Sequence, residues 1–135
     1  STAWGLKDTG LFAVHAATGA GMVGEVIDVV SDEIDRMAAE GPAEAEVARA
    51  KAQLKASLVM NLESASSRAD QIARQFLAFG HVPAIGTLVA KIEAVTPEQV
   101  RALAERLFRA KTPGFSAVGH ISQLTDYGAI SRQFG

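Results

Sequence analysis

Only two short apolar runs in this chain have the length and flanking residues of β-strands, and this shortage limits the folds that it can form. The first run is Leu11–Ala17, between Gly10 and Gly19, and the second is Phe115–Gly119. Short apolar runs bounded by glycine favour buried strands, although alanine is a weak strand former. Because three or more strands with a covered face are normally needed for a stable sheet, part of the sheet is predicted to lie outside this chain.

Apolar residues spaced by three and four predict helices in most of the remaining sequence. The clearest start is Thr96-Pro97-Glu98-Gln99, which combines an N-cap, a proline at the first helical position and a capping-box glutamine. Gly41-Pro42 ends the first helix, and Pro42 can open the next one. Ser66 or Ser67 is the predicted cap of a later helix, which ends at Gly80. The predicted helical ranges are 23–37, 44–62, 67–79, 85–92, 97–108 and 126–134.

These patterns indicate an α+β fold in which five to six helices pack on a small mixed or antiparallel sheet. No linker, internal repeat or low-complexity tract divides the sequence, so residues 1–135 are predicted to form a single partial domain. The opening Ser1-Thr2-Ala3-Trp4 has neither an initiator methionine nor a signal-peptide pattern. We therefore expect the natural start of the protein to lie elsewhere.

The composition argues against several classes of partner. The net charge of -2 gives no electrostatic support for binding to nucleic acid or to an anionic membrane. The absence of cysteine removes disulfides, thiolate catalysis and zinc sites built on cysteine. No apolar run approaches the length that spans a bilayer. We predict a soluble protein without nucleic-acid or membrane partners, in the cytoplasm rather than exported, although composition does not identify the compartment.

The histidine and serine residues show no catalytic pattern. His15, His81 and His120 are far apart in the sequence. None lies in an H-E-x-x-H or H-x-x-E-H arrangement, in which helical spacing puts two imidazoles on one side of a zinc ion. The serines of the segment 64–67 have no basic residue nearby to activate a hydroxyl as a nucleophile.

Two further groups of residues have structural interpretations. A set of acidic residues recurs at helical spacing, and this pattern fits a solvated helix face better than a calcium loop, which needs a glycine. The set is Glu25, Asp28, Asp32 and Asp35. Gly19-Ala20-Gly21 precedes a helix but lacks the lysine and the third glycine of a phosphate loop. The prediction is therefore that this chain contains no catalytic, cofactor-binding or metal-ligating residues.

Several segments resemble one family of peptidases, in the order in which they occur in that family. They are Asp8–Phe12, Glu46–Ser64, Ile72–Gln75 with Phe79-Gly80, Ile92–Val100 and Ala117–Gly119. The family is the pitrilysin/insulinase zinc peptidases, and the resemblance is to the branch that includes the mitochondrial processing peptidases. It covers nearly the whole chain. One departure is His81, where relatives more often carry arginine after the glycine.

The resemblance implies that this chain is the second half of the C-terminal, non-catalytic domain of such a protein, a half of a ferredoxin-type α+β domain. In the family, an H-x-x-E-H helix and a downstream glutamate bind zinc on another segment, and the motif glutamate acts as general base. None of these positions maps onto this chain, so zinc is expected only in the parent protein, if it retains that motif. The implied partners are the catalytic N-terminal domain of the same chain or a partner subunit, and a peptide substrate enclosed in a chamber.

Three functions remain open at this point. The chain is part of a zinc endopeptidase that processes peptides or presequences, a non-catalytic structural or partner subunit of the same family, or an unrelated binding module. An H-x-x-E-H motif elsewhere in the same polypeptide would distinguish the first from the second.

The resemblance also implies a packing arrangement. The helices 44–62 and 67–79 are expected to cover one face of the sheet, with Arg74 paired with Glu63. Leu54, Leu58 and Phe76 recur on the apolar faces of these helices and are therefore predicted to be core residues. Arg49 and Lys51 are expected to be exposed helix charges. The strand 11–17 would present an unpaired edge, which favours self-association, most simply as a two-fold dimer.

Overall fold

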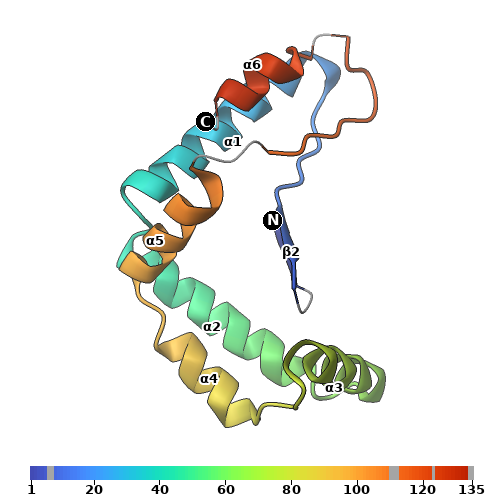
Figure 1. The fold of residues 1–135 in the computed structure, drawn as a ribbon, viewed down its shortest axis with the longest axis vertical. Coiled ribbons are helices and arrows are strands. Elements are labelled where there is room, and N and C mark those ends of the chain that lie inside the picture. Colours follow the sequence, from blue (N-terminus) through green and yellow to red (C-terminus); the bar gives the residue numbers. More distant parts are fainter. Residues whose placement is uncertain (6–7, 110–112, 123, 134–135) are drawn as a thin grey trace. The chain divides into compact units, whose positions relative to one another are not determined.

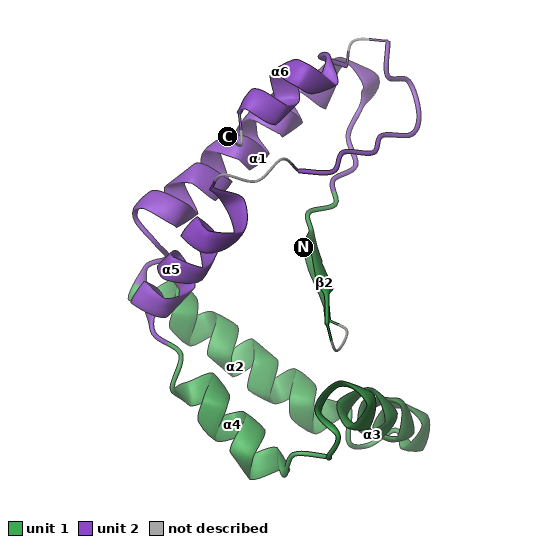
Figure 2. Cartoon of the chain, in the orientation of Figure 1, with its two compact units in different colours: residues 1–15, 44–95 green, residues 16–43, 96–135 purple. Residues whose placement is uncertain are grey.

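The computed structural model describes residues 1–5, 8–109, 113–122 and 124–133 of the chain. These residues form two compact units, shown in different colours in Figure 2. Unit 1 comprises residues 1–15 and 44–95, and unit 2 comprises residues 16–43 and 96–135. The described part of the chain is rich in α-helix and contains a small antiparallel sheet (Figure 1), which confirms the predicted fold class. None of the helices described is both long and apolar enough to cross a membrane.

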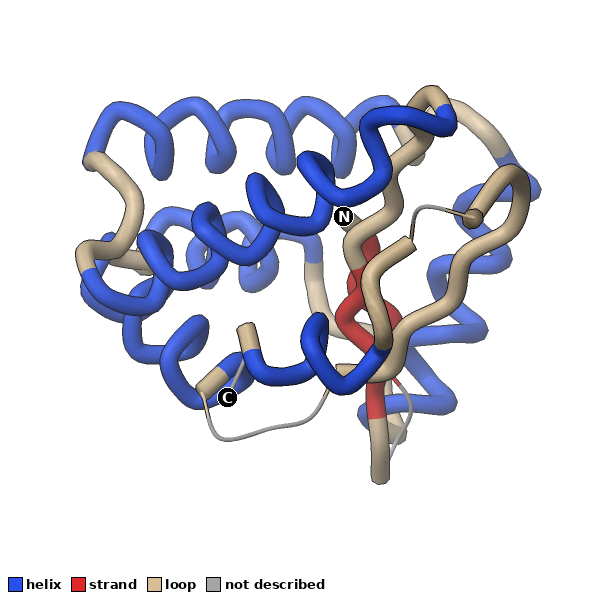
Figure 3. Tube along the Cα trace, turned by 90° about the horizontal axis from the view of Figure 1, so that it is seen from above, coloured by secondary structure: helices blue, strands red, loops and turns tan. Residues whose placement is uncertain are grey.

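The sheet is a two-stranded hairpin in unit 1, coloured red in Figure 3. Strand β1 (Thr2–Gly5) pairs antiparallel with β2 (Gly10–Ala13), and Trp4 lies opposite Leu11. Both side chains are more than half exposed, at 52% and 60%. The two helices that were expected to cover a sheet face therefore leave the hairpin exposed.

The predicted strands were partly wrong. The run 11–17 is extended and paired only as far as Ala13, and Phe115–Gly119 is not a strand. The strand that pairs with β2 is Thr2–Gly5, which the sequence pattern did not indicate. Alanine-rich sequence after Ala13 adds little strand propensity, and a strand needs a neighbour to pair its backbone groups.

Unit 1 also contains three helices with predicted positions. Helix α2 (Glu44–Met60) and helix α4 (Ile85–Glu93) pack against each other, and α3 (Ala65–Phe79) lies between them in sequence. Helix α2 begins two residues after Pro42 rather than at it. The N-cap of α3 is Ser64, whose side chain accepts a hydrogen bond from the Ser67 backbone N–H, so neither Ser66 nor Ser67 is the cap. Gly80 ends α3 in a left-handed conformation, as predicted.

Unit 2 is built on a long helix, α1 (Val23–Ala39), which follows the short 3-10 helix η1 (Ala20–Met22). Helix α5 (Pro97–Phe108) packs along α1, and Ala38 and Ala104 are almost completely buried, at 1% and 4% exposure. The predicted capping box is present at the start of α5, between Thr96 and Gln99. Small buried residues on the two facing helices allow their backbones to approach closely.

The end of the described chain forms helix α6 (Tyr127–Arg132), also in unit 2. Asp126 caps it by accepting a hydrogen bond from the Gly128 backbone N–H. Of the residues predicted to face inward, Ile130 is 2% exposed, whereas Tyr127 is 46% exposed. The third, Phe134, lies outside the described residues.

The predicted core of α2 and α3 was wrong. Leu54 and Phe76 are 57% and 59% exposed, and Leu58 is half-buried. In the described part of unit 1, Val47 is the large apolar residue that is buried, at 7% exposure. The apolar stripe of α3 is present, whereas the apolar residues of α2 are spread around that helix. Most of the large apolar side chains of both helices are not covered by any described residue. Helical periodicity identifies an apolar face without saying which chain packs on it.

Candidate interaction surface

The histidines and acidic residues do not form a metal site in the described part of the chain. No group of three or more histidine, cysteine, aspartate or glutamate side chains there is arranged to hold a metal ion. His15 and His120 are exposed, and the Nδ1 atom of His81 lies 3.1 Å from the Phe79 carbonyl oxygen. On α1, Asp28 accepts a hydrogen bond from Gln133. That the chain has no site residues stays a prediction.

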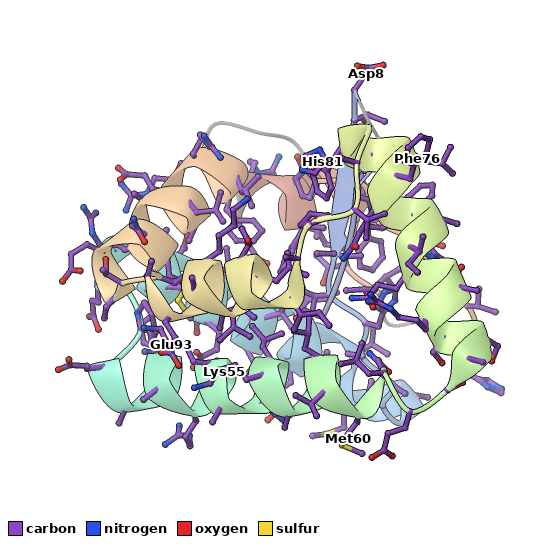
Figure 4. The ribbon with its side chains drawn as sticks, turned by 90° about the horizontal axis from the view of Figure 1, so that it is seen from below. Asp8, Lys55, Met60, Phe76, His81 and Glu93 are labelled. Carbon is purple, nitrogen blue, oxygen red and sulfur yellow. The ribbon has the colours of Figure 1, made fainter. Side chains whose placement is uncertain are left out.

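Exposed apolar side chains are the most prominent chemical feature of unit 1. They come from the hairpin, from α2 and from α3. We call the set the unit 1 apolar surface: Trp4, Leu11, Phe12, Val14, Leu54, Val59, Met60, Ile72, Phe76, Leu77 and Phe79. Figure 4 shows Met60 and Phe76 projecting away from their helices. Exposed apolar side chains that form a contiguous patch are typical of surfaces that bind another protein segment.

Two lysines of α2 bind the end of α4, and Figure 4 shows one of them, Lys55, beside Glu93. The Lys51 Nζ donates a hydrogen bond to the Glu93 carbonyl oxygen at 2.9 Å, and the Lys55 Nζ forms an ion pair with the Glu93 carboxylate. Cations are favourable at a helix C-terminus because unpaired carbonyl oxygens gather there. Lys51 was expected to be an exposed charge, but it is half-buried and bonded. These contacts join α2, which carries part of the unit 1 apolar surface defined above, to α4.

The lysine contacts also change the acidity of Glu93. The hydrogen bond from Lys55, with its charge, lowers the pKa of the Glu93 carboxyl below its ordinary value of 4.5. A carboxyl whose pKa is lowered by folding stabilises the folded state above its ordinary pKa, and this contribution is lost as the pH falls through the folded pKa.

We expect Glu93→Gln to lower the free energy of unfolding at neutral pH, and the difference from the wild type to shrink as the pH falls below 4.5. Because the pair is exposed, the difference should also shrink in high salt. Urea denaturation of both proteins between pH 3 and 7 measures it, with Glu63→Gln as an exposed control. A difference that is constant across this pH range would show that the carboxylate charge contributes nothing.

The predicted bond between α2 and α3 is absent from the described residues. Arg74 was expected to pair with Glu63, but its Nε lies 2.7 Å from the Asp70 Oδ2 atom, one turn earlier in α3. This contact raises the pKa of the Arg74 guanidinium above its usual value. Residues four apart on one helix are close whatever the tertiary structure, so Arg74 pairs with Asp70 rather than with Glu63. Such an exposed pair contributes little to stability.

Comparison with known proteins identifies the family. The family model of the peptidase M16 inactive domain matches residues 1–54. A probable mitochondrial-processing peptidase subunit beta from Arabidopsis thaliana is 34% identical over 127 residues, which are 94% of this chain and 24% of that protein. A protein from Streptomyces coelicolor, described as an uncharacterized zinc protease, is 33% identical over 115 residues, which are 85% of this chain and 25% of that protein.

A solved structure shows the same fold. A chain of complex III2 from Candida albicans, with Inz-5 bound, superposes with a TM-score of 0.89 at 26% sequence identity. The match covers 98% of this chain and 32% of that one. The present chain spans about a quarter of the length of the curated relatives that it matches. Together these matches show that the chain belongs to the peptidase M16, or pitrilysin, family, and that it corresponds to part of the C-terminal inactive domain of these proteins.

Proposed function

We propose that this chain is a non-catalytic part of a zinc-dependent metalloendopeptidase and helps to form the chamber that encloses a peptide or presequence. The observation that carries the proposal is the unit 1 apolar surface on a chain that matches an inactive peptidase domain. In this proposal the zinc is bound by an H-x-x-E-H segment outside residues 1–135. The proposal includes the prediction that residues 1–135 belong to one partial domain. The cytoplasmic location stays a prediction.

The partner that fits the unit 1 apolar surface is another segment of the same family of proteins. In the proposal, it is either the catalytic N-terminal domain of the same polypeptide or a partner subunit. The exposed residues lie on the hairpin and on two helices, so a covering partner would supply both strands and apolar side chains. Without that partner, we propose that the isolated chain associates with itself as a two-fold dimer.

A second function, that of a non-catalytic structural or partner subunit, is favoured by two of the similar proteins. The solved chain of similar fold is part of complex III2, and one of the curated relatives is a mitochondrial-processing peptidase subunit alpha from Bos taurus, 35% identical over 121 residues. The presence of H-x-x-E-H in the same polypeptide supports the enzyme, and its absence supports the subunit.

One substitution tests both functions. In the intact protein, Phe76→Asp places a charge on the unit 1 apolar surface without removing a buried side chain, since Phe76 is 59% exposed. We expect assembly, measured by light scattering, and hydrolysis of an extended peptide to weaken by at least about tenfold, which corresponds to roughly 1.4 kcal/mol of binding free energy. We expect the zinc content, measured by elemental analysis, to stay unchanged at about one ion per polypeptide.

Ala73→Asp is the matched control, because it adds the same charge at an exposed position of α3. Weaker assembly in a protein that holds no zinc and cleaves no peptide would support the subunit function. Loss of zinc from the Phe76→Asp variant would place metal binding close to this chain and contradict the proposal. Unchanged assembly and hydrolysis would show that the surface is not an interface.

A further inference from the structure

Helix α6 depends on the rest of unit 2 for its structure. It has six residues, Tyr127–Arg132, whereas isolated helices shorter than about 12–15 residues are marginal in water. Figure 1 shows it beside α1. Before it, residues 113–122 and 124–126 contain neither helix nor strand. Its helical conformation therefore relies on a small number of contacts with other parts of the unit.

Those contacts come from single side chains. Ile130 is 2% exposed, the largest side chain that is completely buried in the described residues. Gln133, which directly follows α6, joins the segment to α1 with both atoms of its amide. Its Oε1 accepts a hydrogen bond from the Ser31 Oγ at 3.1 Å, and its Nε2 donates one to the Asp28 Oδ1 at 3.0 Å.

The packing of α5 on α1 uses other residues. Ala38 and Ala104 are buried, and Gly41 lies against Arg101, whereas the α6 contacts involve Asp28 and Ser31 in the first half of α1. The buried Ser31 hydroxyl also lies 2.9 Å from the Ile27 carbonyl oxygen. It therefore keeps a hydrogen-bond acceptor when Gln133 moves away, which avoids the cost of an unsatisfied buried hydroxyl.

We propose that α6 is a latch, which opens from α1 and closes on it as a unit while α1 and α5 remain packed. The closed state is held by Ile130 and by the Gln133 amide. The open state exposes the surface of α1 around Ser31. In the closed state Ser31 is buried, at 4% exposure. The latch thus controls access to the first half of α1.

Hydrogen exchange followed by mass spectrometry on the intact protein tests the latch. In the wild type, we expect amides of 127–132 to exchange faster than those of 101–108, with little dependence on low urea concentrations, because local opening exposes little surface. Gln133→Ala should speed exchange in 127–132 by about 5- to 30-fold, the effect of removing both contacts of the Gln133 amide with α1, and leave 101–108 unchanged. Gln53→Ala, which removes an exposed glutamine of α2, should change neither segment.

A second variant, Gln133→Glu, keeps an acceptor for Ser31 but places a like charge beside Asp28, so it should act in the same direction as Gln133→Ala. It serves if the alanine variant does not fold. Equal exchange rates and equal urea dependence of 127–132 and 101–108 in the wild type would overturn the proposal, because α6 would then open only when unit 2 unfolds. Equal acceleration of both segments by either variant would do the same.

Discussion

Replacing Ala38 by aspartate is expected to lower the free energy of unfolding by about 3–5 kcal/mol, the cost of leaving an unpaired charge in a buried position. Ala38 is 1% exposed in α1, which packs along α5. The Ala38 methyl group fits between the packed helices α1 and α5. A carboxylate at this position would be too large for the space and would have no contact with water. Urea denaturation followed by circular dichroism of the helices measures the change.

Ala39→Asp is the matched control for this prediction. Ala39 is exposed and is the last residue of α1, so it is next to Ala38 in the sequence and lies on a different side of the helix. Both substitutions place a negative charge near the helix C-terminus, which costs about 0.3–1 kcal/mol. Only the burial differs between them. Equal losses for the two variants would mean that α1 and α5 do not pack as described.

Gly41→Ala is expected to lower the free energy of unfolding by about 2–4 kcal/mol. Two costs add up. Gly41 has a φ of 78°, in the left-handed region that a Cβ atom disfavours, and an added Cβ would lie 3.0 Å from the Cβ atom of Arg101. The first cost is local strain, and the second arises because α5 lies against the end of α1. Chemical denaturation measures their sum.

Gly80→Ala separates the two costs. Gly80 has a φ of 74°, but no heavy atom lies within 4 Å of the position that its Cβ would occupy. This substitution should therefore cost only the strain, about 1–2 kcal/mol. If both alanine variants lost the same stability, the contact between Gly41 and Arg101 would cost nothing, because Arg101 would move aside.

The features that depend on neighbouring residues in the sequence were predictable. The Thr96–Gln99 capping box formed as expected, since its donors and acceptors are three residues apart. Gly41 and Gly80 both ended helices in the left-handed conformation. Such signals need no knowledge of the tertiary structure. The prediction of Ser66 or Ser67 as a cap was wrong by two or three residues, because the three serines of the segment 64–67 offer the same chemistry.

Features that depend on distant residues were not predictable in the same way. Phe115–Gly119 can form a strand only if a neighbouring strand pairs with its backbone. The composition of the segment does not show whether such a neighbour exists. Leu54 and Phe76 were predicted to be buried from the spacing of apolar residues, but no described residue covers either side chain. The Lys51 hydrogen bond to the Glu93 carbonyl joins residues 42 positions apart. The candidate surface was therefore found only from the exposure of side chains in the structure. The family was found from sequence segments that resemble it and occur in the same order.

The position of Trp4 determines what fluorescence spectroscopy will report on this protein. It is the only tryptophan in the sequence, and it lies on the exposed hairpin, 52% accessible to water. Its emission will therefore follow the fraying of β1 from β2 and the approach of anything that covers the hairpin. A quencher added to the solution should reach it in the folded state. A melting curve recorded at its emission maximum will report the unfolding of the hairpin. It will report little about the unfolding of α1 and α5.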